Sequence, residues 1–320
     1  MSDQKAIDEV KGLYRRKSNQ HGSQREALLQ REGGPGAPLK KYHNTIKRQL
    51  INHFTTEGDT LLDFACGRGG DLRKWFDRKL SYVKGIDLAD SSIEEAKGRL
   101  EEAKPYHRQV TEVDFEASDQ LGQADYVHGG DSPFDAVSCM FAVHYFFDKE
   151  TTLHQFLKNV AANLKEGGYF FGTVPDGKKV CEHLGSSHNH TFDTPMLKLV
   201  AKWEGDPKPF GSAYYCSIAD TVTEGDSGAD GSLEYLVYNS VFMGVAKKVG
   251  LEPVFKYPHT MHNLFQAKDM RESRLLKQFN PHFPQSDPSL VACLSPLLSV
   301  YLSMLFAYFH LLFLQEQASR

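Results

Sequence analysis

Residues 61–74 read LLDFACGRGGDLRK: an apolar run, then a glycine-rich turn, then the start of a helix. Glycine has no Cβ, so such a turn lets a ligand approach the backbone closely. A second apolar run over residues 82–86 ends at Asp87, whose carboxylate can accept hydrogen bonds from both hydroxyls of a ribose. This pattern is typical of the cofactor-binding half of an open α/β sheet: a strand, a glycine turn and a helix, with an acid at the end of the next strand.

The turn departs from the dinucleotide-binding spacing G-x-G-x-x-G, which disfavours NAD as the ligand. A tight turn with a purely structural role is the alternative to a ligand-binding one.

The cysteines and histidines predict no metal site. Five cysteines are scattered without a C-x-x-C pair, so neither a disulfide framework nor a zinc site is indicated, and a reducing compartment fits best. His183, His188 and His190 have no matching cysteine or acidic cluster, and we interpret their segment as a flexible loop. The first ten residues carry charges and no apolar core, so no secretory signal is predicted.

Charge is distributed unevenly along the 320 residues. The net charge of −4 argues against a protein that coats long nucleic acid nonspecifically. Residues 1–50 hold eleven Lys and Arg against five Asp and Glu, which leaves about ten net negative charges on the remainder. A basic arm on an acidic body suits a protein that touches phosphates at one locus.

The alternation of apolar segments predicts an α/β fold with a doubly wound, mostly parallel sheet. We divide the chain into a basic, disordered leader over residues 1–36, ended by a Gly/Pro break, and a domain over 37–320. Residues 175–235 interrupt the alternation and are interpreted as a lobe inserted over the strand ends on the substrate side. The predicted strands are 60–65, 81–86, 108–113, 134–139, 168–174 and 251–256, and the predicted helices are 39–54, 70–79, 91–103, 150–164 and 238–249.

The C-terminal residues 290–314 contain no Asp, Glu, Lys or Arg, and this segment is long enough to span a bilayer. Pro296, several serines and a mixture of β-branched and aromatic residues favour a final pair of buried strands instead. A tail anchor is the alternative.

The pattern D-x-x-C-G-x-G-G-D over residues 63–71 resembles that of class I S-adenosylmethionine-dependent methyltransferases, whose fold is Rossmann-like. Three further segments together resemble the mRNA cap guanine-N7 methyltransferase family. They are LKKYHNTIK at 39–47, CMFAVHY at 139–145 and GTVPD at 172–176. Weaker matches at 205–215 and 233–238 support the resemblance, which extends from residue 39 to about 256.

The resemblance implies that S-adenosylmethionine is the cofactor. Lys47 and the turn at Gly67 would hold its amino-acid end, Asp87 its ribose, and Asp114, taken as the end of the third strand, its adenine amino group. The full set of implied cofactor contacts is Lys47, Ala65, Gly67, Asp87, Asp114, Met140 and Tyr145.

The resemblance also implies a site for the cap of a 5′-capped RNA, divided into two parts. A basic part would face the triphosphate and the first nucleosides, and an aromatic and acidic part would surround the guanine. The implied residues are Asn44, Arg68, Lys74 and Arg99 for the first part, and His144, Tyr145, Pro175 and Glu234, with Tyr301 as a further candidate, for the second.

Four positions depart from the family pattern. Ala65 stands where the family has glycine, and Met140 replaces a glutamine that contacts adenine. His43 replaces the first asparagine of a pair. Tyr301 lies five residues before the Phe306-Ala307-Tyr308 ending instead of three, an offset of two that keeps it on the same strand face.

The implied reaction needs no general base, because guanine N7 already carries a lone pair and the sulfonium methyl is already electrophilic. We therefore assign His144, Tyr145 and Glu234 to positioning, with the Glu234 carboxylate balancing the charge that develops on guanine. We predict that the protein is a monomeric enzyme of the nucleus, and a cytoplasmic or viral setting is the alternative. RNA triphosphatase and guanylyltransferase activities would reside on other chains.

Two other functions are consistent with the same residues. A small-molecule methyltransferase of this fold would have no use for the basic residues of 39–50 or for the Arg68, Lys74 and Arg99 set. A cap-binding or activating module without catalysis would be indicated by failure to bind S-adenosylmethionine, and Ala65 and Met140 motivate that reading.

Overall fold

The computed structural model describes residues 8–13, 15, 34, 36–107, 111–129, 133–185, 190–221, 223–224, 231–255, 257, 259–265, 277–278, 280 and 301–308, to which the following statements refer.

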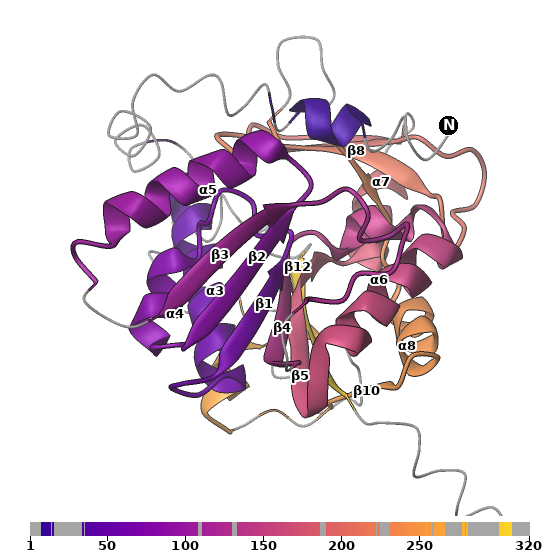
Figure 1. Cartoon of the computed structure of the whole chain (residues 1–320). Helices are drawn as coiled ribbons and strands as arrows, with labels where there is room; N and C mark the ends of the chain where they lie inside the picture. The colour runs from indigo at the N-terminus through magenta and orange to yellow at the C-terminus, as the bar shows by residue number, and fades with distance from the viewer. Residues whose placement is uncertain are drawn as a thin grey trace, which may run out of the picture.

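A mixed sheet with the strand order β10-β12-β5-β4-β1-β2-β3 forms the centre of the molecule (Figure 1). Its five strands from β3 to β5 are mutually parallel, which confirms the predicted doubly wound class. β12 runs antiparallel between β5 and β10. The strand bounds are β1 (Thr60–Phe64), β2 (Tyr82–Asp87), β3 (Glu112–Ala117), β4 (Phe134–Met140), β5 (Leu164–Pro175), β10 (Leu251–Pro253), β11 (Lys277–Gln278) and β12 (Tyr301–Tyr308).

Helices cover both faces of this sheet, because successive residues of each central strand point to opposite faces. Leu61 of β1 packs with α3 (Ala37–Phe54), α4 (Leu72–Arg78) and α5 (Asp90–Ala103). Leu62 and Phe64 pack on the other side with η1 (Val143–Asp148), α6 (Glu150–Asn163) and α8 (Asn239–Lys247). The sheet is therefore buried on both faces, as parallel sheets require.

The third strand begins later than predicted. β3 runs over Glu112–Ala117 instead of 108–113, and pairs with β2 from Tyr82 opposite Glu112. It is an edge strand in which only Phe115 is fully buried. Acidic residues alternate along β3, so the strand lacks the apolar run by which the other strands were predicted. The predicted position of Asp114 at the end of the strand is therefore wrong.

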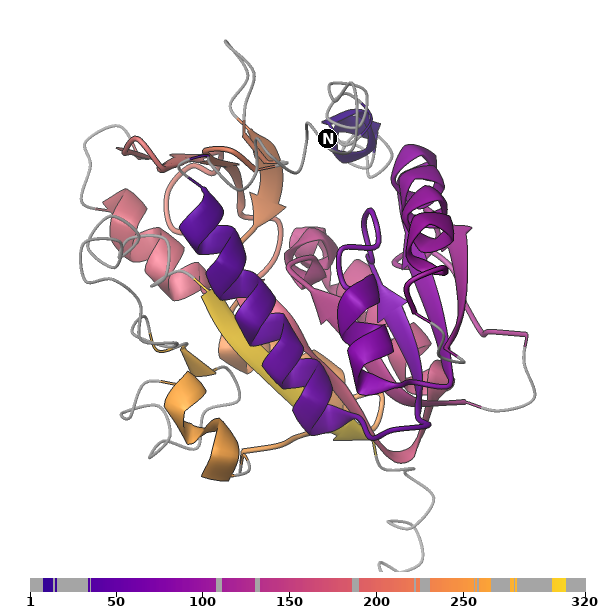
Figure 2. The same cartoon turned by 90° about the vertical axis from the view of Figure 1, so that its left-hand side faces the viewer.

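A second, antiparallel sheet with the order β6-β7-β8-β9 lies between β5 and α8 in the chain. It comprises β6 (Thr191–Asp193), β7 (Leu197–Ala201), β8 (Ala213–Ile218) and β9 (Ser232–Tyr235), and it follows α7 (Gly177–Gly185). Figures 1 and 2 show it beyond the carboxyl ends of the parallel strands. This position is the place where ligands bind in open α/β sheets.

Part of the charge-free C-terminal segment forms β12. Its first residue, Tyr301, pairs with Pro175 at the carboxyl end of β5. Residues 290–300 and 309–314 of the predicted strand pair lie outside the described residues. Among the described helices, none combines the length and apolar character that a membrane span needs.

Candidate active site

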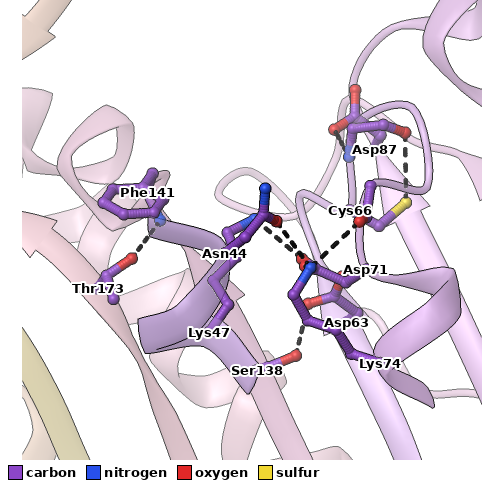
Figure 3. A network of polar contacts seen from close by, with 12 residues as sticks. Asn44, Lys47, Asp63, Cys66, Asp71, Lys74, Asp87, Ser138, Phe141 and Thr173 are labelled. Atoms are coloured by element: carbon purple, nitrogen blue, oxygen red, sulfur yellow. Dashed lines mark hydrogen bonds and ion pairs between the residues drawn. The ribbon is translucent and has the colours of Figure 1, made fainter. Parts of the chain in front are cut away.

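The glycine-rich turn after β1 contacts the end of β2 through Asp87. The backbone N–H of Gly67 donates to Asp87 Oδ2 at 2.8 Å, and the N–H of Ala89 donates to Oδ1 at 3.0 Å. A Cβ built on Gly67 would meet no atom within 4 Å, so this turn borders open space. The turn and the acid that were identified from the sequence thus lie side by side at the carboxyl edge of the sheet (Figure 3).

Ala65 adopts a left-handed backbone conformation with φ of +59°. This region favours glycine, the residue that the resembling family carries here, and it costs an L-residue about 1–2 kcal/mol. The main consequence of alanine in place of glycine at position 65 is therefore backbone strain.

A buried network of charges joins α3 to the start of α4 (Figure 3). Asp71 lies between two amines: its Oδ2 is 2.9 Å from Lys47 Nζ and its Oδ1 is 2.7 Å from Lys74 Nζ. Lys74 Nζ also donates to Asn44 Oδ1 at 2.8 Å. Burial alone would raise the pKa of Asp71, but the two lysines hold it well below its usual range. Asp71 thereby fixes the positions of both amines.

Asp63 on β1 adds a second buried acid beside this network. It accepts a hydrogen bond from Ser138 of β4 and is 2% exposed. Burial, reinforced by the neighbouring Asp71, raises its pKa to about 7. Sequence reasoning assigned no role to Asp63 or Asp71, although both belong to the D-x-x-C-G-x-G-G-D pattern and could have been selected from it.

The predicted triphosphate set is divided in two by the structure. Arg68, 8% exposed, has its Nε 3.2 Å from Glu95 Oε2, and Arg99 pairs with the same carboxylate from the next turn of α5. Lys74 instead belongs to the network with Asp71 and Asn44. Glu95 therefore brings two guanidinium groups together and restricts their movement, whereas Lys74 shares Asp71 with Lys47.

The end of β4 lies between the glycine-rich turn and the aromatic part of the site. Phe141 has a φ of +59°, and its N–H contacts both the carbonyl and the hydroxyl of Thr173. Its ring lies 4.4 Å from that of His43 and 5.7 Å from Lys47 Nζ. The preceding Met140 is buried in the core with α3, so its thioether fills apolar space.

His144 and Glu234 face each other across the aromatic part. His144 Nε2 on η1 lies 3.7 Å from Glu234 Oε1 on β9, and the residues are 2% and 4% exposed. Burial lowers the pKa of His144 to about 3 and raises the pKa of Glu234 to about 8, so this contact is no ion pair at neutral pH. Among the described residues, neither ring nitrogen of His144 has a hydrogen-bond partner.

One hydrogen bond to the pair and several contacts between neighbouring elements surround His144 and Glu234. Tyr214 OH donates to Glu234 Oε2 at 2.9 Å, and Tyr145 OH lies 2.9 Å from Ser232 Oγ. Gly177 permits the start of α7 to approach Val237 closely. A Cβ added at this position would lie 2.6 Å from the Val237 carbonyl oxygen. Pro175 and the pairing partner Tyr301 lie at the same edge of the sheet.

Asp114 is not part of this edge. It is the third residue of β3, and its Oδ2 lies 2.6 Å from Lys84 Nζ, which also contacts Glu116 at 2.9 Å. The acid that follows the carboxyl end of β3 is Asp119, and the adjacent Ser118 donates its N–H to the Asp87 carbonyl. Correcting the strand register would have selected Asp119.

The helical residues 8–13, which the sequence analysis assigned to the leader, lie beyond the carboxyl edge of the sheet (Figures 1 and 2). Tyr215 of β8 donates to Glu9 Oε1 at 2.9 Å, and Lys11 Nζ lies 3.9 Å from Asp119. This segment therefore connects the small sheet with the loop after β3.

No group of three or more metal-ligating side chains occurs in the part of the chain that the structure describes. The site consists instead of a glycine turn, a lysine–aspartate network, an arginine pair and a buried histidine–glutamate pair. This arrangement can hold an extended ligand that is charged at one end and aromatic at the other.

Comparisons with known proteins agree with this description. A family model described as the mRNA (guanine-N(7))-methyltransferase domain matches residues 4–308. The mRNA cap guanine-N(7) methyltransferase 1 of Arabidopsis thaliana is 33% identical over 261 residues, which are 78% of this chain and 68% of that protein. The Saccharomyces cerevisiae mRNA cap guanine-N(7) methyltransferase is 30% identical over 77% of this chain and 57% of its own length.

Among solved structures, a S-adenosylmethionine-dependent methyltransferase from Clostridium acetobutylicum is similar with a TM-score of 0.51 and 14% identity. The match covers 89% of this chain and 98% of that one. At this level of identity the likeness shows the fold alone.

Proposed function

Because the chain belongs to the mRNA (guanine-N(7))-methyltransferase family, we propose that it transfers the methyl group of S-adenosylmethionine to N7 of the guanine of a 5′-GpppN-capped RNA. The observation that carries the proposal is the buried pair His144 and Glu234. Two ring nitrogens that have no hydrogen-bond partner among the described residues, beside a carboxyl oxygen, form a polar lining that a ligand would complete, because unpaired buried polar groups are costly.

Guanine matches that lining better than the other bases do. The Glu234 carboxylate would accept hydrogen bonds from guanine N1–H and N2–H, and His144 would lie beside the same ring. An adenine presents no donor pair at these positions, so it would leave the carboxylate unsatisfied. Tyr145 and Pro175 would flank the ring, and Tyr301, the β12 residue that pairs with Pro175, stays a further candidate.

The cofactor fits the other half of the site. Lys47 and the open side of the Gly67 turn would hold the amino-acid end of S-adenosylmethionine, and Asp87 would hold its ribose. We replace Asp114 by Asp119 as the proposed acid for the adenine amino group, since Asp119 follows β3 next to the end of β2. Ala65, Met140 and Tyr145 would complete the walls of this half.

The phosphates would lie between the two halves. Arg68 and Arg99, held together by Glu95, suit bidentate contacts with phosphate oxygens. Asn44 and Lys74 would approach from the other side, with Lys74 shared between its network and the ligand. Three or four contacts of this kind suit a protein that touches phosphates at one locus.

The residues of the chain contribute orientation and charge balance in this reaction. S-adenosylmethionine supplies an electrophilic methyl group, and guanine N7 attacks without loss of a proton. Alignment of two bound reactants can lower a barrier by about 7–11 kcal/mol. As the guanine becomes cationic, the Glu234 carboxylate is attracted to it more strongly, which favours the transition state over the bound substrate.

The relatives are eukaryotic proteins of mRNA capping, and we extend their setting to this chain. The proposal is a monomeric nuclear enzyme that receives its substrate from RNA triphosphatase and guanylyltransferase activities on other chains. No feature of the site favours a small-molecule acceptor, which would leave the Arg68–Arg99 pair without a ligand.

The test is methyl transfer from labelled S-adenosylmethionine to RNA with a GpppG cap, with uncapped triphosphate RNA and an ApppG-capped RNA alongside. After nuclease digestion, label in 7-methylguanosine from the GpppG sample alone is the expected result. Equal labelling of free guanosine or of the ApppG-capped RNA would contradict the proposal.

A further inference from the structure

The register between β8 and β9 places Tyr214 and Cys216 on the strand face that carries the Glu234 side chain. Tyr214 pairs directly with Glu234, and Cys216 pairs with Ser232 two residues away. Residues spaced by two share a face of the strand, and the burial pattern of β8 alternates so that Tyr214, Cys216 and Ile218 are its buried side chains. Tyr214 and Cys216 therefore point to the same side as the Glu234 carboxyl.

The two oxygens of the Glu234 carboxyl group have different surroundings. Tyr214 OH donates to Oε2 at 2.9 Å, and the Cys216 thiol, on the same strand face, adds to the effect of Tyr214 in opposing the rise of the carboxyl pKa. Oε1 faces His144 Nε2 at 3.7 Å, a separation beyond hydrogen-bond distance. One oxygen is thus fixed by the small sheet, while the other is directed toward the aromatic part of the site.

We propose that Tyr214, assisted by Cys216, is a positioning residue of the methyl transfer, which favours ionisation of the Glu234 carboxyl group and holds that group in the orientation that receives guanine. This inference rests on the proposed function. Tyr214 acts through Glu234 and touches neither reactant, so it is a second layer behind the guanine pocket.

The proposal predicts how activity depends on pH. Burial raises the pKa of Glu234 to about 8, and the hydrogen bond from Tyr214, together with the Cys216 thiol, opposes that rise. Among the described residues, the polar group from another element that faces the carboxyl is the neutral His144 of η1. Since guanine needs an acceptor, the ionised form is the active one, and kcat/KM for capped RNA rises with pH through the free enzyme's pKa.

The experiment compares kcat/KM for GpppG-capped RNA between wild type and Tyr214→Phe from pH 6.5 to 9.5. Losing one hydrogen bond to the ionised carboxylate raises its pKa by about one unit. The ratio of wild type to variant is then about ten at pH 7 and about two at pH 9. Ionisation of the guanine itself cancels in this ratio, because both enzymes use the same RNA.

Tyr126→Phe is the matched control. It removes another tyrosine hydroxyl that hydrogen-bonds to a glutamate, at 3.3 Å from Glu116 on β3. Its ratio to wild type is expected to stay near one at every pH. Glu234→Gln, which cannot ionise, is expected to lose the rising limb altogether and so to identify the titrating group.

Cys216→Ala provides a second variant should Tyr214→Phe fold poorly, with a smaller shift in the same direction. A Tyr214→Phe or Cys216→Ala ratio that is constant across the pH range would overturn the positioning role, even if activity were lower. Wild type that transfers no methyl group to capped RNA at any pH would overturn the proposed function instead, so the two failures are distinguishable.

Discussion

Ala65 has a backbone conformation that favours glycine at its position in the turn. Its φ of +59° belongs to the left-handed region, which costs alanine about 1–2 kcal/mol, whereas glycine loses about 0.5–1 kcal/mol through its greater unfolded-state freedom. Ala65→Gly is therefore expected to raise the free energy of unfolding by up to about 1 kcal/mol. Denaturant titration measures this change. A variant less stable than wild type by more than about 1 kcal/mol would show that the alanine methyl makes essential contacts.

Asp71 is the residue on which the lysine network depends. Asp71→Asn would leave the Lys47 and Lys74 ammonium groups close together without the charge that separates them. Removing one partner of a buried ion pair costs about 3–5 kcal/mol, so a loss near the lower end is expected in denaturant titration, since Lys47 is 20% exposed. Asp77→Asn, which removes an exposed pair with Arg48, is the control and should cost less than about 1 kcal/mol. Equal losses in the two variants would refute the central role of Asp71.

At this scale the sequence predicts residue types better than their partners. The structure places Asp87 beside the glycine turn and Glu234 beside His144. The roles of these residues toward a ligand stay predictions. Lys74 was grouped with the two arginines, since its pairing with Asn44 and Asp71 depends on how α3 packs against α4. Packing between segments that are 30 residues apart leaves no pattern in the local sequence.

The β8–β9 hairpin is the element that carries Glu234, and Gly231 sets its geometry. Gly231 has a φ of +103°, and a Cβ there would lie 2.4 Å from the Cys216 carbonyl oxygen. Gly231→Ala is expected to push β9 away from β8 and to weaken binding of a GpppG dinucleotide at least tenfold, equivalent to about 1.4 kcal/mol. Titration calorimetry with S-adenosylmethionine should give an unchanged affinity, because the cofactor turn belongs to β1. Loss of both affinities together would mean that the two halves of the site do not behave as separate elements.

Element boundaries illustrate which signals are reliable. The central strands β1, β2 and β4 were predicted within one residue, because burial on both faces makes them continuous apolar runs. β3 was misplaced by four residues, since an edge strand with acids at Glu112, Asp114 and Glu116 lacks that run. The same error affected the expected adenine contact, for which we propose Asp119 in place of Asp114.

The whole molecule carries its charge in a pattern that limits RNA contacts. The chain has a net charge of −4, and its basic excess lies within residues 1–50. If only the triphosphate is neutralised, the slope of log affinity against log salt is about −2, from about −0.7 per phosphate on a single strand. The slope for a capped 20-mer should then equal that for a GpppG dinucleotide in fluorescence titrations. A slope that steepens with RNA length would demonstrate a basic track beyond the cap.

The arrangement of the two sheets is the part of the architecture least accessible from sequence. The interruption of the alternation at residues 175–235 indicates an insertion, yet nothing in it specifies that β9 brings Glu234 to within 3.7 Å of His144. That proximity arises from the β8–β9 register and from the close contact at Gly177. The motif resemblance supplied the pair, and the three-dimensional structure supplies its geometry.

The central claim is that one end of this site recognises guanine independently of the cofactor. Single-turnover methyl transfer to GpppG-capped RNA by Glu234→Ala, with the dissociation constant for S-adenosylmethionine measured in parallel, tests it most directly. We predict a transfer rate at least 100-fold below wild type, about 2.7 kcal/mol in the barrier, with the cofactor dissociation constant within twofold of wild type. A variant that transfers at the wild-type rate, or that loses cofactor binding along with transfer, would contradict the account.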